Sequence, residues 1–191
     1  MNRARPRVPG VLPCILGLAV ALGAFERASA DSLDPLPDFE LGAVLGPESE
    51  PKVDRIRVFK SERRMVLLSG DLSVYEYEVA LGGSPAGHKR QQGDERTPEG
   101  EYVIDSRKRD SDFHLALHIS YPNAEDRFRA RKRGVDPGGA IMIHGLPNGF
   151  GLIGAAHRLV DWTDGCIAVT NEEIEEIWRR VTNGVAIEIR P

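Results

Sequence analysis

Apolar and polar residues alternate along much of the chain after residue 53, and a period of two is the pattern of half-buried β-strands. Ile56 and Val58, for example, alternate with Arg55 and Arg57. Polar turns separate the segments of this kind. The segments that predict strands are residues 55–58, 63–68, 75–81, 101–104, 115–119, 141–143 and 185–189.

One segment near the C-terminus has the period of a helix instead. Thr170 or Asn171 provides its N-cap, the acidic residues that follow favour the positive end of the helix dipole, and Asn183-Gly184 ends it. We therefore expect a mainly β fold with one or more packed helices. The apolar stripe of this helix consists of Ile174, Ile177, Trp178 and Val181.

The first thirty residues have the features of an export signal. Three arginines precede an apolar stretch at 11–24, and Ala28-Ser29-Ala30 forms a small-x-small cleavage site. The stretch is shorter than the roughly 20 residues of a membrane span, so we favour an uncleaved anchor less. The sequence predicts a signal peptide at 1–30, a proline-rich linker at 31–52 and a folded domain at 53–191.

Charge and hydropathy exclude some classes of partner. Residues 1–30 contain four of the 25 Lys and Arg residues and one of the 29 acidic residues, so the remainder has 21 basic and 28 acidic side chains and a net charge of −7. This argues against nucleic acid, because phosphate binding needs a positive field. No later apolar run can cross a bilayer, so we expect no stable membrane insertion after signal cleavage. We interpret the basic cluster at 127–133 as solvated surface, with attraction of acidic groups as the alternative.

A single cysteine, Cys166, remains outside the signal segment. One thiol cannot form an internal disulfide, so an exported chain that keeps one points to reactivity. His144 follows the apolar run at 141–143 and is a candidate base for a Cys166 nucleophile. The alternatives are a small buried cysteine and a structural histidine. His157 is less favoured as the base because it lies just beyond the glycine-rich segment 145–154, which we expect to be a flap.

The residues around Cys166 suggest how the nucleophile is presented. Gly165 permits a backbone shape that other residues resist. The amides near Gly165 and Cys166 are then candidates for binding the oxyanion of a tetrahedral intermediate. Thr163 and Asp164 are expected either to fix this turn through its backbone or, for Asp164, to face the pocket and meet His144 or a substrate ammonium.

Two further histidines raise the question of a metal. The alternation around His114 and His118 places them on a strand about 13 Å apart at ~3.3 Å per residue, which is too far for one ion. We expect neither a metal nor an organic cofactor. His114, His118, Tyr121, Asn123 and Trp162 are candidates for substrate contacts, although for Trp162 we favour packing beneath the nucleophile turn.

Four motifs occur in an order that identifies a family. They are GDERTPEG at 93–100, ISYPN at 119–123, IHG at 143–145 and TDGCI at 163–167. Each is unspecific alone, but in this order they resemble the L,D-transpeptidases of the YkuD type. The resemblance covers roughly residues 55–191.

The resemblance implies a β-rich catalytic domain in the periplasm, with roles in cell wall biogenesis and cell shape. Members of the family cut a wall tetrapeptide after the L-centre of meso-diaminopimelate, release D-alanine and pass the acyl group from a cysteine thioester to an amine. By motif, Cys166 is the nucleophile and His144 the base. The backbone oxygen of Gly145 lies where it would orient the histidine ring.

The sequence departs from the family pattern in ways that bear on the substrate. Asp164 stands where a histidine is common, and Ala168 replaces a frequent polar residue. The run Asp-Trp-Thr-x-Gly-Cys resembles a branch that includes enzymes releasing wall-bound lipoprotein by hydrolysis. The expected partners are therefore peptidoglycan stem peptides, with a wall-linked lipoprotein as the alternative. Hydrolysis, as an L,D-carboxypeptidase or amidase, and a non-catalytic wall-binding module stay open.

Overall fold

The computed structural model describes residues 50–191. The expected signal peptide at 1–30 and nearly all of the expected linker at 31–52 lie outside the described residues. Within 50–191, none of the helices has the length and apolar character that crossing a bilayer requires.

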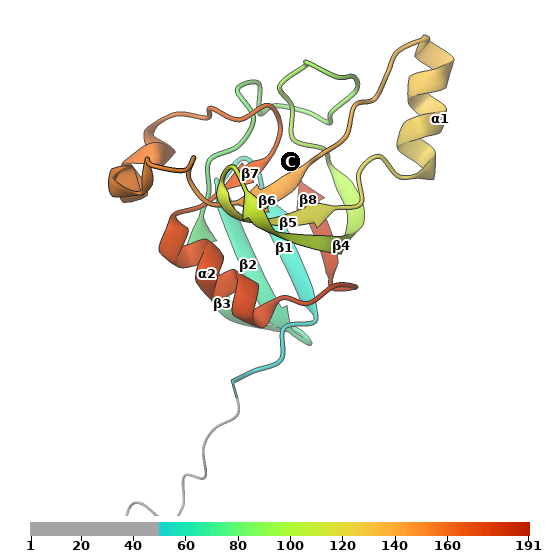
Figure 1. The fold of residues 1–191 in the computed structure, drawn as a ribbon. Coiled ribbons are helices and arrows are strands. Elements are labelled where there is room, and N and C mark those ends of the chain that lie inside the picture. The colour runs from blue at the N-terminus through green and yellow to red at the C-terminus, as the bar shows by residue number, and fades with distance from the viewer. Residues whose placement is uncertain (1–49) are drawn as a thin grey trace, which may run out of the picture. The chain divides into compact units, whose positions relative to one another are not determined.

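The described part is dominated by one sheet, accompanied by two α-helices and a 3₁₀ helix (Figure 1). The predicted mainly β class is therefore confirmed. The strands are β1 (Arg55–Phe59), β2 (Arg64–Ser69), β3 (Leu72–Glu78), β4 (Gly100–Ser111), β5 (His114–Ile119), β6 (Met142–His144), β7 (Ile167–Ala168) and β8 (Ala186–Arg190), and the helices are α1 (Ala124–Arg133), the 3₁₀ helix η1 (Gly151–Leu159) and α2 (Asn171–Arg180).

The strand order β3-β2-β1-β8-β4-β5-β6-β7 brings distant segments together. The 12-residue strand β4 pairs with β8 through its first residues and with β5 through the rest. Beyond the end of β3, Ala80 bridges to Ala168 in β7, so the two ends of the strand order are joined. This bridge places the segment after β3 beside the strand that follows Cys166.

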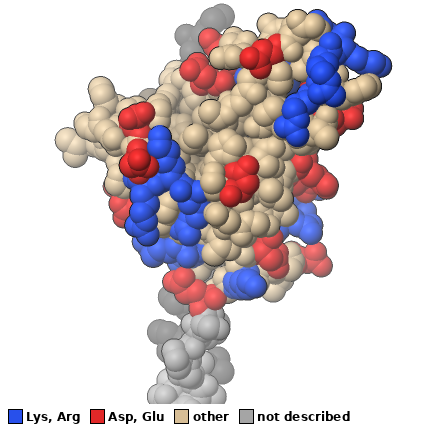
Figure 2. All heavy atoms as spheres, turned by 45° about the vertical axis from the view of Figure 1, so that its right-hand side comes forward, with Lys and Arg blue, Asp and Glu red and all other residues tan. Residues whose placement is uncertain are grey.

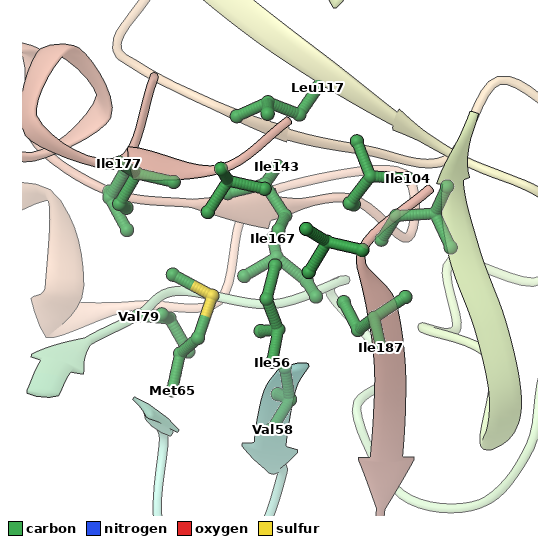
Figure 3. Close-up of a cluster of buried hydrophobic side chains, with 14 of the residues drawn as sticks. Ile56, Val58, Met65, Val79, Ile104, Leu117, Ile143, Ile167, Ile177 and Ile187 are labelled. Carbon is green, nitrogen blue, oxygen red and sulfur yellow. The ribbon is translucent and has the colours of Figure 1, made fainter. Parts of the chain in front are cut away.

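Apolar side chains from strands at both ends of the strand order, such as β2 and β6, meet side chains of α2 in one core (Figure 3). Ile56 and Val58 of β1 and Ile187 of β8 are at most 1% exposed, because alternate residues of these strands face inward. Ile143 and Ile167, which flank the site residues, are also fully buried in it. The core therefore anchors the strands β6 and β7.

Helix α2 covers the sheet through its predicted stripe, and it contacts β5. Thr170 is the N-cap and forms a reciprocal capping box with Glu173. The helix ends at Arg180, earlier than the expected end at 183–184, because Val181 takes an extended backbone (φ −102°, ψ 120°).

Helix α1 was not expected from the pattern, because its sequence has no apolar stripe. Asn123 caps it in a capping box with Asp126, and Gly134 ends it in the left-handed conformation at φ 68°. Its five basic side chains, within the expected cluster at 127–133, are exposed. Basic side chains gather in patches on the face shown in Figure 2.

Candidate active site

One pocket of about 890 Å³ brings the candidate nucleophile and base together. Cys166 and His144 both line it. Two smaller pockets in the described part, of about 420 and 530 Å³, contain neither residue. The lining comes from residues 108–113, 136–144 and 162–166, together with Lys89, Gln92 and Gly93.

The pairing of β6 with β7 explains why two residues 22 positions apart meet. Ile143 pairs with Ile167 and His144 with Ala168 in a parallel register. Continued by one residue, this register sets Cys166 beside Met142, on the strand face that His144 shares. His144 lies two residues beyond Met142. From a strand spacing of ~4.8 Å and a rise of ~3.3 Å per residue, the Cα atoms of His144 and Cys166 are therefore about 8 Å apart, within reach of an imidazole and a thiol.

A single backbone contact sets the tautomer of His144. Its Nδ1 lies 2.7 Å from the carbonyl oxygen of Gly145. A carbonyl only accepts, so Nδ1 carries the proton in the neutral ring and Nε2 keeps its lone pair. Burial lowers the pKa of His144 to about 4, although the Gly145 carbonyl opposes the shift. The ring is therefore a neutral base at physiological pH.

Aromatic rings pack around His144. The ring centroid of Phe113 is 4.5 Å from that of His144, and Trp162 meets His144 edge-on at 5.8 Å. Trp162 also donates from Nε1 to Nδ1 of His157 in η1 at 3.4 Å. His157 itself does not line the pocket. Trp162 thus both packs beside the site and lines the pocket.

The Cys166 thiol is half-buried and neutral in this arrangement. It donates to the carbonyl oxygen of Ala140 at 3.5 Å. Burial raises the pKa of the thiol; the Met142 amide opposes the rise, Asp164 adds to it and Lys89 opposes it. Thiol and imidazole therefore rest as a neutral pair, and a thiolate forms only when His144 takes the proton.

The turn before the nucleophile is held by its own side chain. The Thr163 hydroxyl accepts from the Gly165 amide at 3.2 Å and donates to the Cys166 carbonyl at 2.8 Å. Gly165 has φ 123°, and a Cβ there would lie 2.5 Å from the carbonyl oxygen of Arg96. Only glycine fits this position, for both conformational and steric reasons.

This geometry separates the two amides that were expected to bind an oxyanion. The Gly165 amide is already bonded to the Thr163 hydroxyl. Among residues 50–191, the Cys166 amide has no hydrogen-bond acceptor. The Cys166 amide is thus the better placed donor for developing charge.

The segment that follows His144 is fixed by α2. Asn171 accepts through Oδ1 from the Leu146 amide at 2.9 Å. At Gly145, a Cβ would lie 2.7 Å from that Oδ1 and 3.0 Å from Ile174 Cγ2. Gly145 therefore lets the chain approach α2 closely enough to place its carbonyl against the histidine ring.

Of the other expected site residues, Asp164 and Trp162 line the pocket and four do not. His114 and His118 are on β5 as expected, but they pair with carboxylates of Glu175 and Asp105 at 2.7 and 2.6 Å. The Tyr121 hydroxyl donates to the carbonyl of Pro137, and Asn123 caps α1. In the range 50–191, no three His, Cys, Asp or Glu side chains are grouped as metal ligands.

Sequence reasoning missed most of the residues that line the pocket, and Lys89, Phe113 and Met142 are three of them that contribute to the site. Lys89 and Phe113 lie in segments that looked like an ordinary polar loop and a turn, and Met142 looked like part of a strand. The isolated aromatic at Phe113 between two strand segments was a weak signal. The lysine, in the run His-Lys-Arg-Gln-Gln, had no local feature that distinguished it from a solvated side chain.

With this geometry in view, comparison with known proteins decides the family. A model of the L,D-transpeptidase catalytic domain, YkuD, matches residues 53–189. The chain belongs to the L,D-transpeptidase (YkuD) family. The resemblance found in its motifs is thereby confirmed.

Comparison with individual proteins finds a relative in this family. The chain is similar to YafK of Escherichia coli strain K12, which is named as a candidate L,D-transpeptidase, with 31% identity over 136 residues. The alignment covers 68% of this chain and 48% of YafK, and the same values hold for YafK of Escherichia coli O157:H7. The chain thus spans about half the length of these relatives.

Solved structures confirm the YkuD-like fold. The helical cell shape determining protein Pgp2 of Campylobacter jejuni has a TM-score of 0.56 at 22% identity, over 75% of this chain and 51% of Pgp2. Bd1075 of Bdellovibrio bacteriovorus has a TM-score of 0.51 at 24% identity, over 75% of this chain and 50% of Bd1075. These likenesses concern the fold of the shared part.

Proposed function

We propose that this chain is a cysteine acyltransferase acting on peptidoglycan stem peptides, an L,D-transpeptidase with a thioester intermediate. It releases D-alanine from a donor tetrapeptide and passes the acyl group to an amine. Membership of the family supports the general reaction. The substrate and the acceptor are inferred from the resemblance and from the site.

One observation carries the proposal. The Gly145 carbonyl holds Nδ1–H of His144, which leaves Nε2 free in the pocket that also contains the Cys166 thiol. A free thiol and an oriented neutral imidazole are the two groups that acyl transfer from an amide requires. A wall-binding module needs neither a buried neutral histidine nor a glycine turn that presents a thiol.

The site residues account for each step. His144 Nε2 takes the thiol proton while Cys166 Sγ attacks the carbonyl carbon, and the Cys166 amide binds the oxygen that becomes negative. The C–N bond then breaks, and His144 returns the proton to the departing amine of D-alanine. In the second half, an amine attacks the thioester, His144 takes its proton, and the thiol is restored as the C–S bond breaks.

The proposed setting follows from the sequence. We infer that residues 1–30 direct export to the periplasm, that 31–52 connect to the catalytic domain at 53–191, and that the wall peptide is met there. A wall-linked lipoprotein is the alternative donor. Water in place of the amine gives a hydrolase with the same nucleophile and base.

Mass spectrometry of product mixtures tests the proposal. Protein expressed from the full-length sequence is incubated with a disaccharide tetrapeptide that contains diaminopimelate. We expect D-alanine release with cross-linked dimers, and at least a thousandfold loss in Cys166→Ala and His144→Gln, as for groups that act as a unit. His118→Gln is the matched histidine control, because His118 lies outside the pocket.

Each outcome has a distinct meaning. Cysteine-dependent D-alanine release without dimers identifies a hydrolase. Inactivity on the tetrapeptide but release of a wall-linked lipoprotein identifies the alternative donor. Inactivity on both substrates contradicts the proposal and supports a binding module.

A further inference from the structure

Lys89 is a buried cation at the wall of the active-site pocket. Its residue surface is 3% exposed, yet it is among the residues that line the pocket with Cys166. It belongs to the long loop between β3 and β4. Burying an ammonium costs free energy unless its N–H groups are hydrogen-bonded, so the number of acceptors around Lys89 Nζ matters.

The Lys89 ammonium is not fully hydrogen-bonded within the described residues. In the described chain its Nζ has one partner, Oδ1 of Asp94 at 2.9 Å. That carboxylate is shared, because it also accepts from the backbone amides of Arg90, Gln91 and Arg96. The ammonium therefore retains two N–H donors, and its counter-ion is partly committed to the loop backbone.

The pocket offers Lys89 no second carboxylate of its own. Asp112, Asp136 and Asp164 line the pocket but are exposed, and none of them pairs with Lys89. Their presence with Lys89 and Lys108 makes the lining mixed in charge, with three acidic and two basic side chains. A mixed lining suits a peptide that carries both a carboxylate and an ammonium, and it disfavours a polyanion.

The position of Lys89 relative to the thiol fits a role in substrate binding. The Lys89 charge lies close enough to Cys166 to oppose the rise in the thiol pKa, whereas Asp164 adds to that rise. Both charges therefore act on the reacting centre from within the same pocket. A ligand group bound at Lys89 would lie in the same pocket as the carbonyl that Cys166 attacks.

We propose that Lys89 binds a free carboxylate of the donor peptide and thereby sets its register on Cys166. The inference rests on the proposed function for its substrate. Two carboxylates near the scissile bond share this chemistry: the terminal carboxylate of D-alanine and the carboxylate at the D-centre of diaminopimelate. Charge-assisted hydrogen bonds from the two free donors provide the affinity.

Binding of three peptides tests this inference. The ligands are the tetrapeptide, its C-terminal amide, and the peptide amidated at the D-centre carboxylate. Protein expressed from the full-length sequence carries Cys166→Ala to prevent turnover, and calorimetry gives each Kd. Lys89→Met removes the charge and keeps the stem, Lys89→Arg keeps the charge, and Lys132→Met on α1 is the matched control outside the pocket.

We expect Lys89→Met to weaken binding of the free-acid peptide by about tenfold to hundredfold, the range for a hydrogen bond to a charged group. Amidation of the relevant carboxylate weakens binding to the Lys89 protein by a similar factor, and Lys89→Met then has no further effect. That amide identifies the carboxylate. Equal losses on all three peptides, or none on any, overturn the inference.

A second measurement separates this inference from the proposed function and from a role on the thiol alone. Iodoacetamide alkylation of Cys166 is followed with and without N-acetyl-D-alanine or its amide. Protection by the acid, absent with the amide and lost in Lys89→Met, supports the carboxylate site even if the tetrapeptide is not a substrate. A Lys89→Met effect confined to the pH midpoint of alkylation, with no change in protection or Kd, overturns it.

Discussion

The two buried lysines among residues 50–191 occupy regions of opposite character. Lys60, at the end of β1, donates from Nζ to the carbonyls of Gly87 and Thr97 at 2.7 and 3.0 Å and to Glu99 at 2.8 Å. Its three donors are all used, and it ties the loop between β3 and β4 to the sheet. Lys89, in the same loop, uses one donor and faces the pocket.

The difference shows that one loop can be tied to the sheet through a lysine whose donors are all used and still carry a second lysine with donors left for a ligand. A buried polar group whose partners are complete serves stability. A buried group with donors to spare, like Lys89, or with a free lone pair, like His144 Nε2, is completed only by something that enters the pocket. We therefore expect changes in the Lys60 region to affect folding and changes in the pocket to affect binding and chemistry.

The largest expected effect on stability is at Lys60. Lys60→Met leaves two carbonyls and Glu99 without their donor, so we expect a loss of about 3–5 kcal/mol in the free energy of unfolding. Lys89→Met should cost about 1 kcal/mol, because Asp94 keeps its three backbone amides. Urea unfolding of both variants measures the contrast, and equal costs would make Lys89 a structural residue.

A methyl group at Gly165 tests the close approach of the backbone beside the nucleophile. Gly165→Ala forces a Cβ to 2.5 Å from the Arg96 carbonyl at φ 123°, and we expect a loss of about 3 kcal/mol together with loss of activity. Gly149→Ala is the matched control, since Gly149 also has positive φ (88°) but has no atom within 4 Å of its Cβ position. It should lose about 1 kcal/mol, and a similar loss at Gly165 would refute the close approach.

The buried neutral His144 predicts a dependence of stability on pH. Its folded pKa of about 4 lies below the ordinary 6.5, so the unfolded chain binds more protons between these values and stability falls as pH falls. From pH 6.5 to 5, His144 accounts for about 2 kcal/mol, at roughly 1.4 kcal/mol per unit.

Chemical denaturation at the two pH values measures this loss. In His144→Gln the loss should shrink by about that amount, although burial also lowers the pKa values of His88 and His157, which act in the same direction. An unchanged pH dependence in this variant would mean that His144 is not neutral in the folded protein.

The smallest expected effect concerns the Thr163 hydroxyl. Thr163→Val removes the acceptor of the Gly165 amide and the donor to the Cys166 carbonyl, so we expect about 1–2 kcal/mol of destabilisation and a lower kcat with KM nearly unchanged. Thr163→Ser keeps the hydroxyl and should restore kcat. A KM effect as large as the kcat effect would show that Thr163 acts on substrate binding instead.

Local patterns located seven of the eight strands and α2, because alternation and an apolar stripe are read within ten residues. They missed the two-residue strand β7 and the second half of β4. They failed at α1, where the buried residues are Asp126 and Ala130 and no stripe exists. The capping signal at Asn123 was present but was interpreted as a possible substrate contact. Capping residues and binding residues are drawn from the same polar types, so sequence alone separates them poorly.

The sequence by itself determined the chemistry available to this protein: one thiol outside the expected signal segment, a histidine after a buried strand, and glycines at 145 and 165, where the chain packs closely beside the site. Tertiary structure decided what surrounds them. The pairing of β6 with β7 placed His144 near Cys166, and the fold carried His114, His118, Tyr121 and Asn123 elsewhere. Only the folded loop shows that Lys89 is buried with donors unused, because burial and partner count depend on residues far apart in the chain.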